Sequence, residues 1–206
     1  MNIGIVDYGL GNVKSVKSAF EYLGYNAQLC QYENDFNEVS HIVIPGVGSY
    51  ERGINLLKGK KIIPLLNHHV CEKKKPTLGI CLGLQLMSKR GLEFGNHNGL
   101  NWFSGDVVEI PIENKNSTLP NIGWEEVQFN ENSELFSEIK QNSDFYFVHS
   151  FYYKPLDNNE IIATYDIGAT KITAAIQKEN IIATQFHPEK SQDNGLQLLE
   201  NFIKMK

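Results

Sequence analysis

The stretch "TLGICLGLQLM", residues 77–87, places one cysteine between two glycines where an apolar run gives way to helical spacing. The run "TLGIC" is typical of a short buried strand, and the residues after it favour a helix. Gly79, Cys81 and Gly83 form the pattern G-x-C-x-G, the thiol form of the nucleophile elbow. A nucleophile on such a strand-to-helix turn has a strained backbone, and side chains two residues away on either side would collide. The stretch therefore predicts a strand that ends at Cys81 and a helix directly behind it.

Outward from this strand, the first half of the chain alternates between strand-like and helix-like segments. "NIGIV" (2–6) is a short β-branched run, and it leads through "DYGLGN" (7–12) into apolar residues at helical spacing that end at Gly24. Further strands are expected at 27–30, 41–46 and 77–81, with helix in 51–75. Such alternation makes a parallel sheet that helices cover on both faces.

From about residue 98 the pattern changes to strand-like runs that Asn, Gly and Pro turns separate. Helical spacing returns at 193–205, and no repeat or linker interrupts the chain, so residues 1–206 are expected to form one domain. The predicted fold class is α/β, with a central, mostly parallel sheet flanked by helices and additional antiparallel strands in the second half. The strand-like runs of that half are 105–110, 125–129, 145–153, 160–165, 171–177 and 180–188.

The composition argues against several classes of protein. The chain has 206 residues, 41% hydrophobic and 21% charged, which fits one globular domain with a substantial core. Its 19 Lys and Arg against 24 Asp and Glu form no long block, so no nucleic-acid partner is expected. No apolar run approaches the roughly 18 residues that span a bilayer, and the first residues do not resemble a signal peptide, so we expect a cytoplasmic protein without a membrane partner. Three cysteines without CxxC spacing are expected to be reduced thiols.

Two segments look like ligand sites but have the wrong spacing. A dinucleotide-binding G-x-G-x-x-G that begins at Gly9 needs a third glycine where Lys14 stands, so "GLG" is interpreted as a tight turn whose amides can still approach a partner or ligand. His68, His69 and Cys71 lack a second ligand pair, and adjacent histidines on a helix point about 100° apart. They are interpreted as a helix surface. We expect neither a metal nor a cofactor.

Two motifs each leave a structural and a functional interpretation open. "PGVG" (45–48) is either a turn with positive φ or a loop at the carboxyl edge of the sheet whose N–H groups bind an oxyanion. Cys81 is either a small core residue, since cysteine is among the most buried residue types, or a nucleophile. A helix that begins behind Cys81 would favour its thiolate form, and the N–H of Leu82 could supply half of an oxyanion hole.

A cysteine nucleophile needs a base and a group that orients this base. "QFHPEKS" (185–191) offers both, because His187 follows a strand-like run and Glu189 lies two residues further on. In an extended segment these two side chains fall on the same side, so the carboxylate can hold one imidazole nitrogen while the other faces the thiol. Together, Cys81, His187 and Glu189 favour a cysteine hydrolase over a buried core cysteine.

With these residues in place, the sequence resembles the class I, triad-type glutamine amidotransferases, and more narrowly the glutaminase subunits of imidazole glycerol phosphate synthase from histidine biosynthesis. G-x-C-x-G-x-Q and H-P-E are shared by many class I members, whereas D-Y-G-x-G-N, P-G-V-G-S and H-P-E-K-S together are specific to this branch. The matching segments spread over nearly the whole chain. They are 5–16, 43–53, 78–87 and 183–191, supported by 146–153.

The resemblance implies glutaminase chemistry. Cys81 would attack the side-chain amide of glutamine, His187 would shuttle protons, ammonia would leave, and water would hydrolyse the glutamyl thioester to glutamate. Glu93 would meet the ammonium group of the bound glutamine. The other residues implied at the substrate are Gln85, His149, Ser150 and Tyr152, with backbone amides of Leu82, Val47 and Gly48 as the oxyanion hole.

The resemblance also implies a partner. In the family, ammonia passes into a separate (βα)8 synthase subunit that makes imidazole glycerol phosphate and AICAR, and the two subunits form a heterodimer. A dry route keeps ammonia reactive, because free ammonia at neutral pH is mostly protonated and then is no nucleophile. The helix opened by Asn12, the "NIGWEE" loop (121–126) with Trp124, and Lys190 of H-P-E-K-S would face this synthase.

Two departures from the family pattern concern the partner rather than the chemistry. Family members usually carry M-G-W-N where this chain has Ile122-Gly123-Trp124-Glu125, and "GLNW" (99–102) replaces the more usual G-L-G. A paralogous group pairs the same glutaminase with an amidotransferase for surface sugars, so this pathway is the alternative. A stand-alone cysteine hydrolase and a catalytically silent subunit are the remaining hypotheses, and an intact triad argues against the silent subunit.

Overall fold

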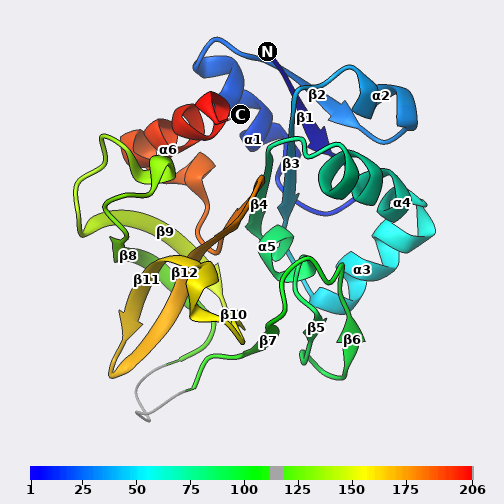
Figure 1. The fold of residues 1–206 in the computed structure, drawn as a ribbon. Coiled ribbons are helices and arrows are strands. Elements are labelled where there is room, and N and C mark those ends of the chain that lie inside the picture. The colour runs from blue at the N-terminus through cyan, green and yellow to red at the C-terminus, as the bar shows by residue number, and fades with distance from the viewer. Residues whose placement is uncertain (112–117, 206) are drawn as a thin grey trace.

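The computed structural model describes residues 1–111 and 118–205, whose strands form two sheets (Figure 1). The larger sheet contains β1 (Asn2–Val6), β2 (Asn26–Cys30), β3 (His41–Gly46), β4 (Thr77–Cys81), β8 (Asn121–Phe129), β9 (Ser143–His149), β11 (Ile161–Ile167), β12 (Thr170–Lys178) and β13 (Ile181–Thr184). The smaller sheet contains β5 (Arg90–Gly91), β6 (His97–Asn98), β7 (Asp106–Glu109) and β10 (Phe151–Lys154).

The larger sheet is parallel in one half and antiparallel in the other. Its strand order is β2-β1-β3-β4-β13-β12-β11-β8-β9. The pairs from β2 to β13 are parallel, and the pairs from β13 to β9 are antiparallel. The predicted α/β class with added antiparallel strands is confirmed. Because the parallel strands share one direction, β3, β4 and β13 end at the same edge of the sheet.

Helices cover both faces of the parallel half (Figure 1). The helical segments are α1 (Val13–Tyr22), α2 (Glu33–Asn37), α3 (Tyr50–Gly59), α4 (Ile62–Leu66), the π-helix η1 (Asn67–Glu72), α5 (Leu82–Leu86), the 3₁₀ turns η2 (Glu134–Phe136), η3 (Asn158–Glu160) and η4 (Pro188–Lys190), and α6 (Gln192–Lys204). On one face α1 and α6 share a core with Val43 of β3, and on the other α3 and α4 share a core with Ile42 and Ile44. Successive residues of β3 thus enter different cores, as the strand period of two requires.

The chain passes from the larger sheet to the smaller one at Ser150, between β9 and β10. β10 then pairs antiparallel with β7, and β7 pairs with β5. His149 therefore ends a strand of one sheet and Phe151 begins a strand of the other. This crossing brings the two sheets together beside the carboxyl edge of the parallel strands.

Three expectations about local structure are wrong. The "NIGWEE" segment is not a loop, because residues 121–126 lie in β8 and pair with β9, which satisfies their backbone groups. The helix expected at 51–75 is broken at Lys61, which has a φ of 56°. His69 does not lie on a helix surface: it is 2% exposed, and its ring stacks on Phe36 with the centroids 5.6 Å apart. Burial lowers the pKa of His69 and so favours the neutral ring that this packing needs.

The three cysteines, Cys30, Cys71 and Cys81, are free thiols, as the sequence predicts. Over the ranges that the structure describes, helices with the length and apolar character to cross a membrane are absent.

Candidate active site

Cys81 lies on the sharp turn between β4 and α5. Its φ of 54° and ψ of −109° fall in a region that residues with a side chain rarely adopt, as the G-x-C-x-G pattern predicts. A Cβ on Gly83 would overlap the carbonyl oxygen of Ile44, so only glycine allows α5 to pack this closely on β3. The turn thereby holds the sulfur at the carboxyl edge of the sheet.

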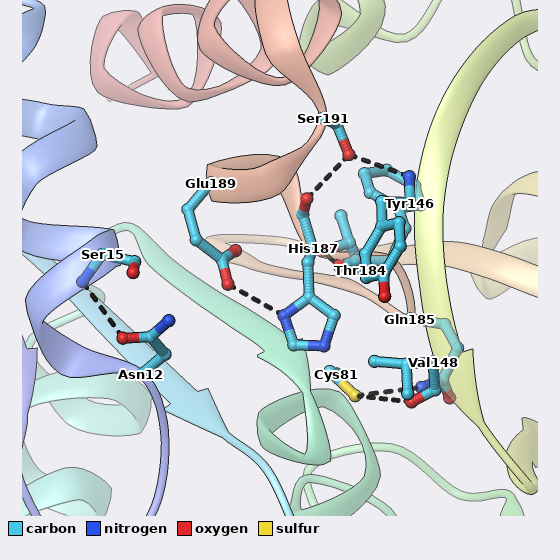
Figure 2. A network of polar contacts seen from close by, with 11 residues as sticks. Asn12, Ser15, Cys81, Tyr146, Val148, Thr184, Gln185, His187, Glu189 and Ser191 are labelled. Carbon is cyan, nitrogen blue, oxygen red and sulfur yellow. Dashed lines mark hydrogen bonds and ion pairs between the residues drawn. The ribbon is translucent and has the colours of Figure 1, made fainter. Parts of the chain in front are cut away.

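His187 and Glu189 form a buried pair beside Cys81 (Figure 2). His187 Nδ1 lies 2.9 Å from Glu189 Oε1, and the two side chains are 2% and 1% exposed. Within the described residues His187 Nε2 makes no hydrogen bond of ordinary geometry, and Figure 2 shows it pointing toward Cys81. The sequence suggested an extended segment, but residues 188–190 form the 3₁₀ turn η4, which brings the carboxylate back to the ring.

The surroundings of His187 favour its protonated form. Burial alone would lower the pKa of His187, but the facing Cys81 sulfur and the Glu189 carboxylate outweigh burial and raise this pKa to about 10. At neutral pH the ring therefore carries a proton on each nitrogen, one of them facing the sulfur. The arrangement can provide a nucleophilic thiolate with a proton donor beside it.

A cavity of about 400 Å³ lies over Cys81, between the turn after β3, the elbow and the crossing from β9 to β10. Among the described residues no group of three or more His, Cys, Asp or Glu side chains is placed to hold a metal ion. The cavity therefore presents one nucleophile and a set of polar groups. The predicted residues that line it are Val47, Gly48, Cys81, Leu82, Gln85, Glu93, His149 and Ser150.

Tyr152 does not line this cavity, and four residues that the sequence did not single out do. Tyr152 is 7% exposed in β10, whereas its neighbour Phe151 faces the cavity, as strand alternation requires. Phe151 and Tyr152 are adjacent in "HSFYY". Assigning which side chains of this strand face the cavity would have identified Phe151 in place of Tyr152. The four additional lining residues are Phe94, Pro120, Val148 and Phe151.

Backbone groups fix the orientation of Glu93 and Gln85. Glu93 Oε2 accepts a hydrogen bond of 2.6 Å from the N–H of Tyr50, the first residue of α3, where the helix dipole favours negative charge. Gln85 Nε2 donates to the carbonyl oxygen of Phe151 at 2.8 Å. Both side chains are therefore anchored on the protein while they line the cavity.

Burial keeps His149 neutral, and hydrogen bonds fix its tautomer. Its Nδ1 lies 2.9 Å from the Phe151 carbonyl oxygen, so Nδ1 carries the proton and Nε2 accepts from the Tyr165 hydroxyl at 2.8 Å. Asn121 Nδ2 donates to the same hydroxyl at 3.4 Å. Burial lowers the pKa of His149 to about 4, and the charge of His187 acts in the same direction. The Phe151 carbonyl thus sets the tautomer of a ring in the cavity, and residues of β8 and β11 complete its hydrogen bonds.

The turn after β3 lies beside the elbow because Gly46 pairs with Cys81. Gly48 has a φ of 104°, so the turn needs glycine for its conformation, and it also lines the cavity. Both interpretations left open for "PGVG" therefore have structural support. The buried Tyr8 of "DYGLGN" donates from its hydroxyl to the Pro45 carbonyl at 2.8 Å, which ties the N-terminal motif to this turn.

The residues predicted to face a partner lie on the surface. Asn12 Oδ1 accepts from the N–H of Ser15 at 3.3 Å and caps α1 (Figure 2). Trp124 is 44% exposed, and its ring packs against Tyr146 with the centroids 5.8 Å apart. Lys190 Nζ lies 5.6 Å from the centroid of the same Tyr146 ring. We name Trp124, Tyr146 and Lys190 the aromatic–lysine cluster.

Comparison with known proteins agrees with this geometry. The model of the family "Glutamine amidotransferase class-I" matches residues 4–205. The imidazole glycerol phosphate synthase subunit HisH 1 of Campylobacter jejuni (strain RM1221) is 42% identical over 203 residues, which cover 98% of this chain and 100% of that protein. The imidazole glycerol phosphate synthase subunit HisH of Pelagibacter ubique (strain HTCC1062) is 39% identical over 209 residues, which cover 100% of each chain.

Solved structures with low sequence identity share the fold. A crystal structure of a glutamine amidotransferase aligns with a TM-score of 0.74 at 18% identity, over 97% of this chain and 98% of that one. PurLQS from Thermotoga maritima aligns with a TM-score of 0.73 at 15% identity, over 98% and 97% of the two chains. With the family model matched over residues 4–205 and relatives about 40% identical along the full length, this chain belongs to the class-I glutamine amidotransferase family.

Proposed function

We propose that this chain is the glutamine-hydrolysing subunit of an imidazole glycerol phosphate synthase, with Cys81, His187 and Glu189 as its catalytic residues. The observation that carries the proposal is the geometry of Cys81, which sits on a strained elbow under a cavity and beside a buried imidazole that a carboxylate orients. The relatives named imidazole glycerol phosphate synthase subunit HisH support this pathway.

In the first half of the reaction, the Cys81 thiolate attacks the carbon of the glutamine side-chain amide and forms a tetrahedral intermediate. The negative charge on the oxygen is met by backbone N–H groups of Leu82 and of the Val47–Gly48 turn, which line the same cavity. His187 then gives its Nε2 proton to the leaving nitrogen, the carbon–nitrogen bond breaks, and ammonia leaves a glutamyl thioester on the sulfur.

In the second half, His187 has lost a proton and acts as the base. It takes a proton from a water molecule that attacks the thioester carbon, and the bond from carbon to sulfur breaks. Glutamate leaves, and the thiolate and protonated imidazole are restored. In both halves Glu189 favours the protonated ring, because its carboxylate lies 2.9 Å from Nδ1 and the two side chains are 2% and 1% exposed.

The lining residues match the two ends of a glutamine molecule. The Glu93 carboxylate offers a partner for the substrate ammonium, and Gln85, His149 and Ser150 place polar groups around the rest of the cavity. Tyr152 is proposed to act indirectly, since it is buried behind Phe151. The anchoring of Glu93 and Gln85 on backbone groups lowers the entropy that binding would cost.

We further propose that the ammonia is passed to a (βα)8 synthase subunit in a heterodimer, which makes imidazole glycerol phosphate and AICAR. Asn12 and the aromatic–lysine cluster supply an exposed polar and aromatic surface for such a partner. The three free thiols fit a protein that works in the cytoplasm, and we propose that residues 1–206 act as one domain.

Glutamate release from glutamine tests the proposal. It is measured for the purified chain alone, and with an imidazole glycerol phosphate synthase cyclase subunit and its nucleotide substrate, with Cys81→Ala as control. We expect strong stimulation by the partner that vanishes in Cys81→Ala. Turnover that depends on Cys81 but ignores this partner would move the chain to the paralogous sugar pathway or to independent hydrolysis. No turnover under either condition would overturn the glutaminase assignment.

A further inference from the structure

Gln185 is a buried polar residue that neither the motif nor the cavity accounts for. It is 0% exposed and stands two residues before His187, just after β13. Its backbone N–H donates to the carbonyl of Ala174 in β12 at 2.8 Å, so the main chain is fixed at this point. Gln185 does not line the cavity, and Figure 2 shows its side chain next to the Cys81 sulfur, on the side of Val148.

The side chain of Gln185 connects two other groups of the site. Its Nε2 donates to the Cys81 sulfur at 3.6 Å, and its Oε1 accepts from Gln85 Nε2 at 3.2 Å. Gln85 Nε2 also donates to the Phe151 carbonyl oxygen at 2.8 Å. A continuous chain of hydrogen bonds therefore runs from the crossing between the two sheets to the nucleophile.

The direction of this chain follows from its first acceptor. The Phe151 carbonyl can only accept, so the atom of Gln85 that meets it is the amide nitrogen. The second hydrogen of that nitrogen needs an acceptor, which makes the facing atom of Gln185 its oxygen. The remaining atom of Gln185, its nitrogen, must then face the sulfur. A reversed Gln185 amide would set its nitrogen against the nitrogen of Gln85 and its oxygen against a thiolate.

We infer that Gln185 is a positioning residue, which presents an N–H to the Cys81 sulfur, stabilises its thiolate form and sets the direction from which it attacks. This inference rests on the proposed function, since it takes Cys81 as the nucleophile. The Val148 carbonyl acts against the thiolate. The Cys81 thiol donates to this oxygen at 4.0 Å, and a carbonyl oxygen disfavours a negative charge on the sulfur. The N–H of Gln185 offsets this carbonyl from the same side of the sulfur (Figure 2).

The other titratable groups around the sulfur form no hydrogen bond with Gln185 among the residues that the structure describes. His187 faces it from the segment after β13, with Glu189 behind it, and Tyr8 is near it from the turn after β1. Burial and the charge of Cys81 raise the pKa of Tyr8, which stays protonated, and burial keeps His149 neutral. A shift in the reactivity of Cys81 in a Gln185 variant therefore reports the lost N–H.

The experiment is alkylation of the full-length chain by iodoacetamide from pH 5 to pH 10, with the rate at each cysteine followed by peptide mass spectrometry. It needs no glutamine and no partner. In Gln185→Met, which removes the donor without adding charge, we expect Cys81 to react about tenfold more slowly at pH 7, the factor that one hydrogen bond to a charged group provides. The rise of the rate with pH should also move to higher pH.

Two controls separate this role from a general loss of structure. Cys71, which is half-buried and distant in the fold, should keep its rate in every variant. Gln197→Met removes a comparable amide, which donates to Asn201 at 3.0 Å in α6, and should leave Cys81 unchanged. If Gln185→Met does not fold, Gln185→Glu carries the test, because it keeps the size and the acceptor for Gln85 and replaces the donor with the oxygen of an ionisable carboxyl group.

In Gln185→Glu the rate at Cys81 should fall below that of Gln185→Met, because an acceptor then faces the thiolate. A folded Gln185 variant whose Cys81 alkylation keeps the wild-type pH profile would overturn the inference. Absence of glutamine turnover in the wild-type chain would contradict the proposed function alone, because alkylation is measured without substrate. The two failures are therefore distinguishable.

Discussion

At the scale of single residues, the reactivity of Cys81 depends on neighbours with opposite effects. The Val148 carbonyl accepts from the Cys81 thiol, whereas Gln185 donates an N–H to the sulfur and His187 faces it. Glu189 acts on the sulfur only through His187. Because the side chains of His187 and Glu189 are both shielded from water, their mutual attraction is weakly screened. The protonation of one imidazole therefore links the chemistry to the stability of the fold.

Glu189→Gln can test whether protonation of His187 raises or lowers the stability of the fold. The folded-state pKa of His187, about 10, lies above the value of roughly 6.5 for an unfolded histidine, so folding favours the protonated ring. The stabilisation is complete below about pH 6.5 and is lost as the pH rises toward 10. Glu189→Gln keeps an acceptor for Nδ1 but removes the charge, so the free energy of unfolding should fall less between pH 7 and pH 10 than in the wild type.

The measurement is denaturant unfolding at several pH values in this range. Glu200→Gln is the matched control, because Glu200 forms an exposed pair with Lys204 in α6, and it should keep the wild-type slope. The same Glu189→Gln variant should lose at least about tenfold in glutamine turnover, since the ring is no longer held as a proton donor. A wild-type dependence of stability on pH in Glu189→Gln would contradict the assignment of the raised pKa to this pair.

At the scale of elements, the site depends on how closely α5 packs on β3. The two glycines of the elbow are not equivalent. A Cβ on Gly79 would meet mainly the end of the flexible Met87 side chain, whereas a Cβ on Gly83 would overlap the backbone oxygen of Ile44. Side chains can move aside at low cost, but a paired strand cannot. The helix behind Cys81 is therefore more sensitive at Gly83.

Gly83→Ala should lower the free energy of unfolding by about 1–3 kcal/mol, the usual cost of overpacking, and should displace the elbow. Glutamine turnover should fall by about a hundredfold, because small misplacements of a nucleophile are costly. Thermal unfolding and glutamate release measure the two effects. Gly59→Ala is the control, since among the described residues nothing lies within 4 Å of a Cβ at this position of α3. Equal stability of the two variants would contradict the packing argument.

Helices and strands could be predicted from the sequence where the local hydrophobic pattern favours the same structure as the tertiary contacts. The apolar runs at 41–46 and 77–81 coincide with β3 and β4, because each run is buried along its whole length. The segment 121–126 was expected from the family resemblance to be a loop, yet pairing with β9 makes it part of β8. Propensity is a weak guide where a long-range partner satisfies the backbone.

The sequence predicted those residues of the candidate site that lie in recognisable motifs. Cys81, His187 and Glu189 lie in short patterns with a chemical meaning, and the structure places them together. Gln185 has no such pattern, because its importance comes from contacts with Cys81 and Gln85 across the fold. Contacts of this kind depend on strand order and register, which a single sequence does not give.

At the scale of the whole molecule, the carboxyl ends of β3, β4 and β13 meet at one edge (Figure 1). Phe151 of the smaller sheet lines the cavity from another side. The exposed Trp124 and Lys190 come from β8 and η4, segments that lie next to β9 and His187. A partner that contacts this surface would therefore be close to the nucleophile. Such an arrangement suits a subunit that hands on a reactive product.

The choice of partner should depend on Glu125, which puts a half-exposed carboxylate on β8. Glu125→Asn should weaken binding to the true synthase partner by about tenfold, because a charge at an interface is usually matched by the opposite charge across it. Calorimetric titration with an imidazole glycerol phosphate synthase cyclase subunit measures the affinity. Glu179→Asn is the control, since Glu179 pairs with Lys74 at the opposite end of β4 and should leave binding unchanged. Unchanged affinity in Glu125→Asn would show that this carboxylate does not contribute to the interface. The choice of partner would then have to depend on Trp124 and Lys190.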